Sequence, residues 1–423
     1  MRSAIITALD IGSSYVRSII AKDLGSGRLE ILGIGECESE GIERGIVKDI
    51  QALSARVAKA LAEAENSAKT PAQNIHCNIT GEHIRTYVGD GRISIPTETP
   101  HEPGEITLEH VEQVINDAKN SVKIQKGFER FRILHGLPHN FVIDNQNDIH
   151  NPVNMNGFHL IAKVYAILSE LTPLRNLSKC IELAGYDIDP ENFVLNHIAV
   201  SEAVLSEDEK RLGALVLDIG GGTCDLSIYS RSSLEKVIVV PMAGKNITED
   251  LAIGLKTTLS NAEYIKVEYG NALASSVDQS VEIDVEGISG RAPSRRTQYL
   301  VSHVIQHRVE EMLALCYDKA KDFYTPELVT AGIVLCGGTA NLVNVDRVLS
   351  EAFNLHVKVA TPDLSRLNGM ISRLEDPAYA TVIGLLYLAS GKELESGSKG
   401  FSLNTLKSNK IVDKFKKILK DFT

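Results

Sequence analysis

The sequence has no apolar run that could cross a membrane and no paired cysteines. A transmembrane helix needs about 18 or more consecutive apolar residues, and none occurs in the 423 residues. The N-terminus lacks a basic segment followed by a long apolar one, so no secretory signal is expected. The six cysteines form no Cys-x-x-Cys pair and no zinc-finger spacing with histidine, which indicates reduced, buried thiols in a reducing compartment.

Basic charge is also scarce, because the chain carries a net charge of −11. An acidic protein of this size is a poor general nucleic-acid binder, so no nucleic-acid partner is expected. The twelve histidines are scattered; His135 and His139 are close in sequence, but no carboxylate arrangement supports a metal site there. With 43% hydrophobic and 23% charged residues the chain is of globular type, and its length predicts two to four folding units.

What the sequence does contain is an internal repeat. Leu-Asp-Ile-Gly occurs at residues 9–12 and again at 217–220, each time at the end of an apolar segment. A third glycine turn, at residues 337–339, also follows directly after an apolar segment. A repeat at half the chain length predicts two lobes of related fold with a cleft between them.

Local patterns predict the other elements. Residues 4–22 form a β-hairpin, and a β-rich stretch with several glycines and prolines follows residue 80. Apolar residues at helical spacing and end signals predict helices at 47–66, 108–122, 173–185, 248–258, 260–272 and 299–321, and one opened by Asn341. Pro173 is expected as the first residue of its helix.

The two repeated turns have the chemistry of a phosphate site. Glycines allow several backbone N–H groups to point at a phosphate, and a strand-end carboxylate can hold Mg²⁺ through water. Asp10 stands just before Gly12, and Asp218 stands just before Gly220. There is no Gly-x-x-x-x-Gly-Lys-Ser/Thr sequence, so the site is not a P-loop.

These motifs resemble those of the actin and Hsp70 ATPase superfamily. Residues 10–14 and 218–223 resemble its two phosphate motifs, residues 335–340 its adenosine motif, and residues 262–266 the helix whose Glu and Lys reach ribose and adenine. Residues 199–203 and 380–385 resemble its two connecting helices. All these elements occur in the superfamily's order. The resemblance implies an α/β, actin-like two-lobed ATPase fold made of duplicated ribonuclease-H-like domains.

Within the superfamily the chain resembles the FtsA family of bacterial cell-division proteins over nearly its whole length. The similarity includes Gly81-Glu82-His83-Ile84 leading into a β-rich insert, the stretch from Asp144 to Ile161, and Gly290-Arg291-Ala292-Pro293 before a long helix. Ala243 stands where the family often has a second glycine, which puts one phosphate contact in doubt. The implied domains are a first lobe core at 1–84 and 167–212, an inserted subdomain at 85–166, a second lobe core at 213–242 and 325–390, its outer subdomain at 243–324, a flexible linker at 391–409 and a C-terminal amphipathic helix at 410–423.

The resemblance implies the site residues one by one. Asp10 and Asp218 would hold Mg²⁺ through water, and Glu202 would orient the attacking water, although the family is noted for weak or undetectable hydrolysis. The residues implied to surround ATP are Gly12, Ser13, Ser14, Tyr15, Gly220, Gly221, Gly222, Thr223, Gly244, Glu263, Lys266, Gly337, Gly338 and Thr339.

The last 14 residues contrast with the rest of the chain. They contain five lysines and two aspartates, and their apolar residues fall on one stripe of a helix. A helix of this length is marginal alone in water, so it needs an apolar surface. Two interpretations stay open: packing on its own domain, or an in-plane membrane helix whose lysines meet anionic lipids. For the second, the residues are Ile411, Val412, Lys414, Phe415, Lys417, Ile418, Leu419 and Phe422.

One further cluster has two interpretations. Arg291, Arg295 and Arg296 precede a predicted helix. They are either a solvated face or a site for an acidic peptide, and the resemblance implies the C-terminal peptide of the tubulin-like protein FtsZ.

The expected function is an ATP-binding scaffold of cell division, at most a slow ATPase. It would form head-to-tail filaments at the cytoplasmic face of the cell (inner) membrane at the septum, anchor the FtsZ ring and recruit later division proteins. A small-molecule kinase of the same fold is the alternative, although it leaves the tail unexplained. A chaperone ATPase would need a longer chain, and the insert motifs argue against a pilus-assembly relative.

Overall fold

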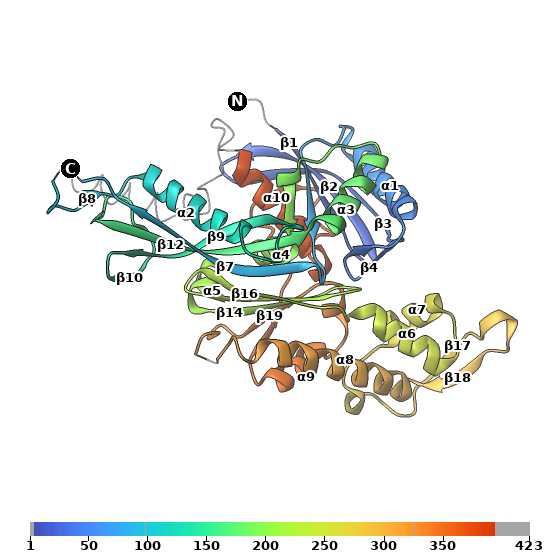
Figure 1. The fold of residues 1–423 in the computed structure, drawn as a ribbon. Helices are drawn as coiled ribbons and strands as arrows, with labels where there is room; N and C mark the ends of the chain where they lie inside the picture. The colour runs from blue at the N-terminus through green and yellow to red at the C-terminus, as the bar shows by residue number, and fades with distance from the viewer. Residues whose placement is uncertain (1–3, 98, 326, 394–423) are drawn as a thin grey trace. The chain divides into compact units, whose positions relative to one another are not determined.

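The structure is a computed structural model that describes residues 4–97, 99–325 and 327–393. The chain forms two compact units (Figure 1). The first, here called the body, comprises residues 4–24, 28–82 and 176–387. The second, here called the insert, comprises Gly25–Gly27, His83–Arg175 and residues 388–393.

The first sheet of the body begins with a hairpin. Strand β1 (Ile5–Ile11) pairs antiparallel with β2 (Tyr15–Gly25) and parallel with β6 (Ile75–Ile79). The full strand order is β13-β6-β1-β2-β3-β21, in which β13 spans Phe193–Leu195, β3 Arg28–Glu38 and β21 Leu367–Gly369. Six of the seven residues of β1 are buried, as expected for a central strand covered on both faces.

The second sheet of the body repeats this plan. Strand β14 (Ala214–Ile219) pairs antiparallel with β15 (Cys224–Ser230) and parallel with β19 (Ile333–Cys336). The order is β16-β15-β14-β19-β20, with β16 at Ser233–Val240 and β20 at Val357–Val359. In both sheets a hairpin is followed by two parallel strands, so the duplicated fold predicted from the repeated motif is confirmed.

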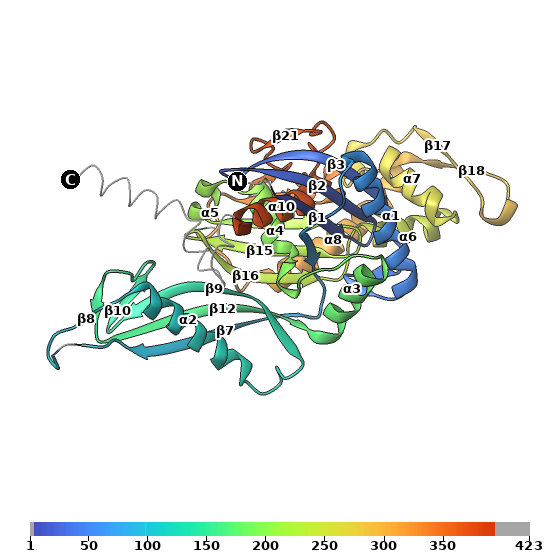
Figure 2. The same ribbon diagram turned by 90° about the horizontal axis from the view of Figure 1, so that it is seen from above.

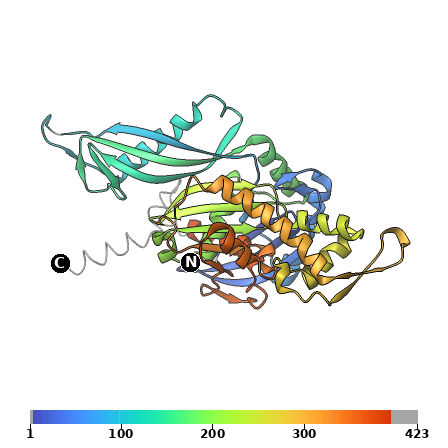
Figure 3. The same ribbon diagram turned by 90° about the horizontal axis from the view of Figure 1, so that it is seen from below.

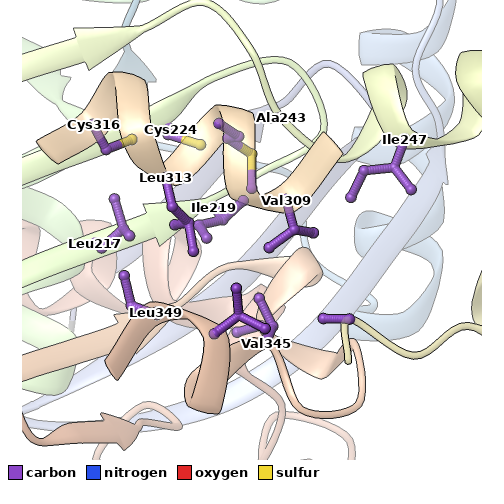
Figure 4. Close-up of a cluster of buried hydrophobic side chains, with 14 of the residues drawn as sticks. Leu217, Ile219, Cys224, Ala243, Ile247, Val309, Leu313, Cys316, Val345 and Leu349 are labelled. Atoms are coloured by element: carbon purple, nitrogen blue, oxygen red, sulfur yellow. The ribbon is translucent and has the colours of Figure 1, made fainter. Parts of the chain in front are cut away.

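Helices cover the sheets of the body. The large core of the second lobe lies where α8 (Gln298–Ala320) and α9 (Val345–Phe353) cover one face of the second sheet (Figure 3). Leu217 and Ile219 of β14 meet Val309 and Leu313 of α8 and Leu349 of α9 there (Figure 4). Burial of such side chains is worth about 1.5–3 kcal/mol each.

The remaining elements of the body connect or extend the two sheets. Among the described residues they are β4 (Ile42–Glu43), β5 (Ile46–Val47), α1 (Ile50–Ala68), α4 (Asn196–Val204), α5 (Glu207–Leu212), α6 (Gly244–Leu255), α7 (Leu259–Tyr269), β17 (Glu282–Val285), β18 (Ser294–Thr297) and α10 (Ala380–Glu393). Helix α3 (Leu171–Leu183) leads from the insert into the body.

The insert is a sheet with one helix on it (Figure 2). The strand order is β10-β9-β12-β7, with bounds Gln146–Ile149, Phe131–Ile143, His159–Glu170 and Ile84–Ser94. Helix α2 (Leu108–Lys123) buries Val111, Val114 and Ile115 against Phe141 and Leu160 of the sheet. The short strands β8 (Gly104–Glu105) and β11 (Asn156–Gly157) pair beside it.

Several element boundaries differ from the sequence predictions; α6, for example, runs over Gly244–Leu255 and not over 248–258. Helix α3 begins at Leu171, so Pro173 is its third residue and not its first. Asn341 ends a 3₁₀ turn, and α9 begins at Val345. Helix α10 runs to Glu393, into the segment predicted as linker from 391, because Ser and Gly lower helix propensity without ending a helix.

All six cysteines are buried thiols, as expected. Among the described helices, none has the length and apolar character needed to span a bilayer. The predicted amphipathic helix at 410–423 lies outside the described residues, as does most of the predicted linker.

Candidate functional site

The two repeated motifs form matching turns. In the first, the backbone N–H of Gly12 donates to the carbonyl oxygen of Tyr15 over 3.0 Å. In the second, Gly220 donates in the same way to Thr223, also over 3.0 Å. Asp10 and Asp218 therefore stand at equivalent positions, two residues before the first glycine of each turn. Both side chains are buried.

Asp10 is oriented by the parallel neighbour of its strand. The side-chain amide of Asn78, in β6, donates to Oδ1 of Asp10 over 2.7 Å, and its own Oδ1 accepts from the backbone N–H of Ile11 over 2.8 Å. Burial raises the pKa of Asp10 to about 6, although the Arg17 guanidinium and the Asn78 hydrogen bond act in the opposite direction. The fold itself therefore orients Oδ1 of Asp10.

The hairpins differ at the residue that faces the aspartate across the strands. Asp10 faces Arg17 in the first hairpin, whereas Asp218 faces Asp225 in the second. Burial and then the charge of Asp225 raise the pKa of Asp218 to about 7. The second hairpin therefore places two buried acidic groups together, where the first has an acid and a base.

Asn196, at the start of α4, joins the two acids of the second hairpin. Its amide nitrogen donates to Oδ2 of Asp218 over 2.7 Å and to Oδ2 of Asp225 over 2.8 Å. Its oxygen accepts from the hydroxyl of Thr381 in α10, and the other oxygen of Asp225 accepts from Thr80, both over 2.8 Å. These residues come from both lobes and from both connecting helices.

The glycines of the second turn allow it to approach the first turn. A Cβ at Gly221 would lie 2.0 Å from the hydroxyl oxygen of Ser14, and one at Gly222 would lie 2.3 Å from that of Ser13. Any side chain at these two positions would push the turns apart. The two predicted phosphate turns therefore face each other at close range.

The residues predicted around the nucleoside also come together. Nζ of Lys266 donates to the carbonyl oxygen of Gly244 over 3.1 Å and to Oε2 of Glu263 over 2.7 Å. Gly244 and Thr339 both donate to the carbonyl oxygen of Gly220, over 3.1 Å and 2.9 Å. Helices α6 and α7 and the third glycine turn thus join the second phosphate turn.

The backbone of Gly337 packs against the carboxylate of Asp218. Its φ of +84° is in the left-handed region, and a Cβ there would lie 2.2 Å from Oδ1 of Asp218. No other residue type would fit. Its neighbour Gly338 is less constrained, because its nearest contact would be Ala378 at 3.8 Å.

Tyr15 and Thr223 differ in exposure. Tyr15 is 39% exposed, and its pKa is raised by burial and then by Glu38 and Glu36. Thr223 is buried and contributes its carbonyl oxygen to the second turn.

Glu202 lies apart from this network. Its carboxylate forms ion pairs with Lys210 over 3.2 Å and with Arg366 over 3.4 Å, and it takes no part in the hydrogen bonds around Asp218. It lies six residues, about 1.7 turns, further along α4 than Asn196. The side chain that this helix brings to the strand-end carboxylates is Asn196.

The arginine cluster is also remote from the paired turns in sequence and in fold. Arg295 and Arg296 belong to strand β18, which pairs with β17. Arg295 forms ion pairs of 3.3 Å with Glu282 and with Asp284. Arg291 is exposed. The eight residues predicted to contact a membrane lie outside the described residues.

The buried acids fit a hydrated Mg²⁺ ion. Burial raises the pKa of Asp10 and of Asp218, and the charges of Asp225 and Asp10 raise the pKa of Asp218 further, so a bound cation would favour the charged forms of Asp10 and Asp218. Within the described part of the chain, no three Asp, Glu, His or Cys side chains gather closely enough to ligate one ion directly. An ion held mainly through water, with few protein ligands, matches the preference of Mg²⁺.

Asn78, Asn196 and Asp225 were not predicted from the sequence. Asp225 could have been predicted, because in the aligned repeats it stands at the position of Arg17, and that position faces the strand-end aspartate. The two asparagines carry no motif of their own, since each reaches its aspartate from another element.

Comparison with known proteins identifies the family. A family model described as "Cell division protein FtsA" matches residues 215–384, and one described as "SHS2 domain inserted in FTSA" matches residues 81–168. The chain is 31% identical to the cell division protein FtsA of Pseudomonas aeruginosa over 96% of this chain and 94% of that protein. It is 32% identical to FtsA of Escherichia coli K12, over 92% of this chain and 90% of that protein.

Solved structures agree on the fold. A PilM–PilN type IV pilus biogenesis complex matches with a TM-score of 0.62 and 15% identity, over 91% of this chain and 98% of that one. MreB 5 of Spiroplasma citri bound to AMPPNP matches with a TM-score of 0.53 and 15% identity, over 94% of this chain and all of that one. The repeated sheets, the matched insert and the identity over nearly the full length of the relatives lead to one conclusion: the chain is an actin-like cell division protein and belongs to the FtsA family.

Proposed function

We propose that this protein binds Mg²⁺-ATP between its paired turns and acts as a membrane-linked scaffold of cell division. The observation that carries the proposal is the pair of matched turns, each with a buried aspartate, facing each other at Gly221 and Ser14. The fold neighbour MreB 5 is bound to AMPPNP, which supports an adenine nucleotide as the ligand.

Each part of the site would contact a different part of Mg²⁺-ATP. Backbone N–H groups of the two turns bind the phosphates, and Asp10 and Asp218 hold the ion through water. Lys266 and Glu263 are placed for the ribose and adenine beside Gly244. Bound Mg²⁺ would neutralise phosphate charge and favour the ionised form of the buried acids.

Slow or absent hydrolysis is part of the proposal. A water must be held in line with the bond between the β- and γ-phosphates, and a small misplacement costs orders of magnitude in rate. Glu202, the predicted water-positioning residue, is held by Lys210 and Arg366. Asn196 is neutral and is occupied by two carboxylates, so it is a poor general base.

The scaffold role rests on family membership and on the tail. We infer head-to-tail filaments from family membership, since a heterologous contact between identical chains whose rotation does not close generates an open filament. We also infer that FtsZ and later division proteins are partners, in line with the family name, and that the amphipathic segment at 410–423 attaches the protein to anionic lipid at the inner membrane. Many weak tails on one filament would bind tightly through effective concentration.

Two measurements test the proposal. The first is titration of the full chain with fluorescent ATP in the presence and absence of Mg²⁺, where Asp10→Asn or Asp218→Asn should lower the affinity at least about tenfold. The second is co-sedimentation with anionic vesicles, comparing the full chain with one that ends at Ser408. Tail-dependent pelleting that ATP strengthens is expected.

Each result is informative by itself. Equal pelleting with and without residues 409–423 would remove the membrane role and leave the nucleotide site intact. Phosphate transfer from ATP to a sugar or acid would instead favour the small-molecule kinase.

A further inference from the structure

Helix α8 carries two histidines one turn apart on its exposed side. Its inner side buries Val301, Ile305 and Val309 in the core of the second lobe. His303 and His307 are both exposed, and their four-residue spacing puts them on one face of the helix. Nothing in the nucleotide site involves them.

One ring nitrogen of each histidine, Nε2, faces the other histidine. The Nε2 atoms of His303 and His307 are 3.2 Å apart, and the rings lie with their centroids 4.5 Å apart at an angle of 73°. Two imidazole nitrogens that bind one tetrahedral ion at about 2.0–2.1 Å lie about 3.3 Å from each other. The observed separation already fits a shared ion.

Neighbouring side chains hold the pair in this arrangement. Oε2 of Glu310 lies 3.8 Å from Nδ1 of His307, the nitrogen that faces away from the pair. The other oxygen of Glu310 accepts a hydrogen bond of 2.7 Å from Gln306, which fixes the carboxylate. The ring of Tyr299 stacks on His303 at 5.9 Å and 12°.

The Glu310 carboxylate stands on the side of the His307 ring that faces away from the pair, at a distance beyond that of a direct hydrogen bond. A carboxylate on this side of the ring is commonly found behind metal-binding histidines, where it orients the ligand. A hydrogen bond between two neutral rings would need only the 3.2 Å contact, and it would not need Glu310.

We propose that His303 and His307 form a binding site for one transition-metal ion of the Zn²⁺ and Ni²⁺ class. Imidazole suits these ions, whereas Mg²⁺ takes oxygen ligands, so the site is chemically distinct from the paired aspartates. Because no third His, Cys, Asp or Glu joins the pair in the described part of the chain, water or an added ligand completes the coordination.

The chain contains a matched control pair. His135 and His139 have the same spacing but lie in strand β9. Residues four apart on a strand are about 13 Å apart, so they cannot share an ion. Both pairs have the same spacing in the sequence. Only the helix brings its two histidines close enough to share an ion.

Isothermal titration of the untagged full chain with ZnCl₂, and separately with NiCl₂, in excess Mg²⁺ tests the proposal. One ion per chain is expected at this site. His303→Ala and His307→Ala should each abolish it or weaken it at least about tenfold, and Glu310→Gln should weaken it about tenfold. The double variant His135→Ala/His139→Ala should bind as the unchanged chain does.

Because the histidines are exposed, metal-free melting curves of the variants should match that of the unchanged chain. If His303→Ala/His307→Ala binds Zn²⁺ and Ni²⁺ with unchanged affinity and stoichiometry, the assignment is wrong. Unchanged Zn²⁺ and Ni²⁺ affinity in Glu310→Gln would contradict only the role of the carboxylate. Neither outcome depends on ATP binding, so this test and that of the nucleotide site fail separately.

Discussion

Asn196 donates a hydrogen bond of 2.7 Å from its side-chain amide to Asp218 and so ties helix α4 to the end of strand β14. The same amide serves Asp225, and Thr381 holds its oxygen, which fixes the orientation of the amide. Removing the hydrogen-bond donor of a buried acid lowers the free energy of unfolding by about 1–3 kcal/mol. This one side chain therefore supports two acids.

Replacement of Asn196 should destabilise the body. For Asn196→Ala we expect the free energy of unfolding, without nucleotide, to fall by about 2–4 kcal/mol, because two buried carboxyl groups lose a donor. Asn196→Asp should be worse, since it adds a third acid. Urea denaturation at neutral pH measures both.

The control is Asn341→Ala, which removes an exposed hydrogen bond of 3.0 Å to Asp376 and should change little. If Asn196→Asp is as stable as the unchanged chain, Asn196 does not act as the shared donor.

The raised pKa values of Asp10, about 6, and Asp218, about 7, give the nucleotide-free protein a pH dependence. The folded state binds these protons more tightly than the unfolded chain. Their contribution to stability is therefore complete below the ordinary pKa of 3.8 and is lost as the pH rises through about 6 to 7. The Tm should decrease between pH 5.5 and pH 8, and Asp218→Asn should flatten this decrease.

Mg²⁺-ATP should reverse the trend, because a bound cation favours the ionised acids. Thermal melts at both pH values, with and without Mg²⁺-ATP, measure this, and the rise in Tm on binding should be larger at pH 8. An equal slope in Asp218→Asn and in the unchanged chain would show that Asp218 is not the group responsible.

How much the sequence predicts depends on how local the signal is. The turns at Gly12 and Gly220 were predictable, because each is set by a few adjacent residues that occur twice. Lys266 and Glu263 were identified through a family motif, and the structure brings them to Gly244. The pairing of Asn196 with Asp218 was not predictable, since it joins a helix start to a strand end through the fold alone.

Helix ends show the same limit. The end of α10 was predicted too early, because Ser390 and Gly391 are typical of linkers. The structure continues the helix to Glu393, and a glycine costs a helix only about 1 kcal/mol. The amphipathic segment at 410–423 stays a prediction.

A partly buried ion pair between helices α6 and α8 should contribute to stability. Arg308 of α8 meets Asp250 of α6 through two parallel contacts, of 2.5 Å and 2.9 Å, and both side chains are less than one third exposed. Arg308→Met keeps most of the apolar stem but loses both hydrogen bonds to Asp250 and a third, of 2.6 Å, to the exposed Glu311. We expect a loss of about 1–2 kcal/mol in the free energy of unfolding.

The comparison is Lys321→Met, which breaks the exposed pair with Asp318 and should leave the free energy of unfolding almost unchanged. Urea denaturation of both variants decides the matter. Equal costs would mean that Asp250 is adequately solvated without Arg308.

The two connecting helices approach each other closely at Gly384 and Ala199, so a larger residue at position 384 should lower stability. A Cβ at Gly384 of α10 would lie 1.7 Å from the carbonyl oxygen of Ala199 in α4. Neither the Cβ position nor this oxygen can move without its helix backbone. The helices must separate to accept Gly384→Ala, and such overpacking costs about 1–3 kcal/mol, more than the gain of up to about 1 kcal/mol in helix propensity.

Gly391→Ala in the same helix is the matched control, because nothing lies within 4 Å of its added methyl group. It should be neutral or stabilise by up to about 1 kcal/mol. Since α4 carries Asn196 and α10 carries Thr381, separation of the helices should also break the hydrogen bond between them. Gly384→Ala should therefore lower both the Tm and the affinity for Mg²⁺-ATP, whereas Gly391→Ala should leave the affinity unchanged. A Gly384→Ala protein that melts and binds like the unchanged chain would mean that the helices can move apart at no cost.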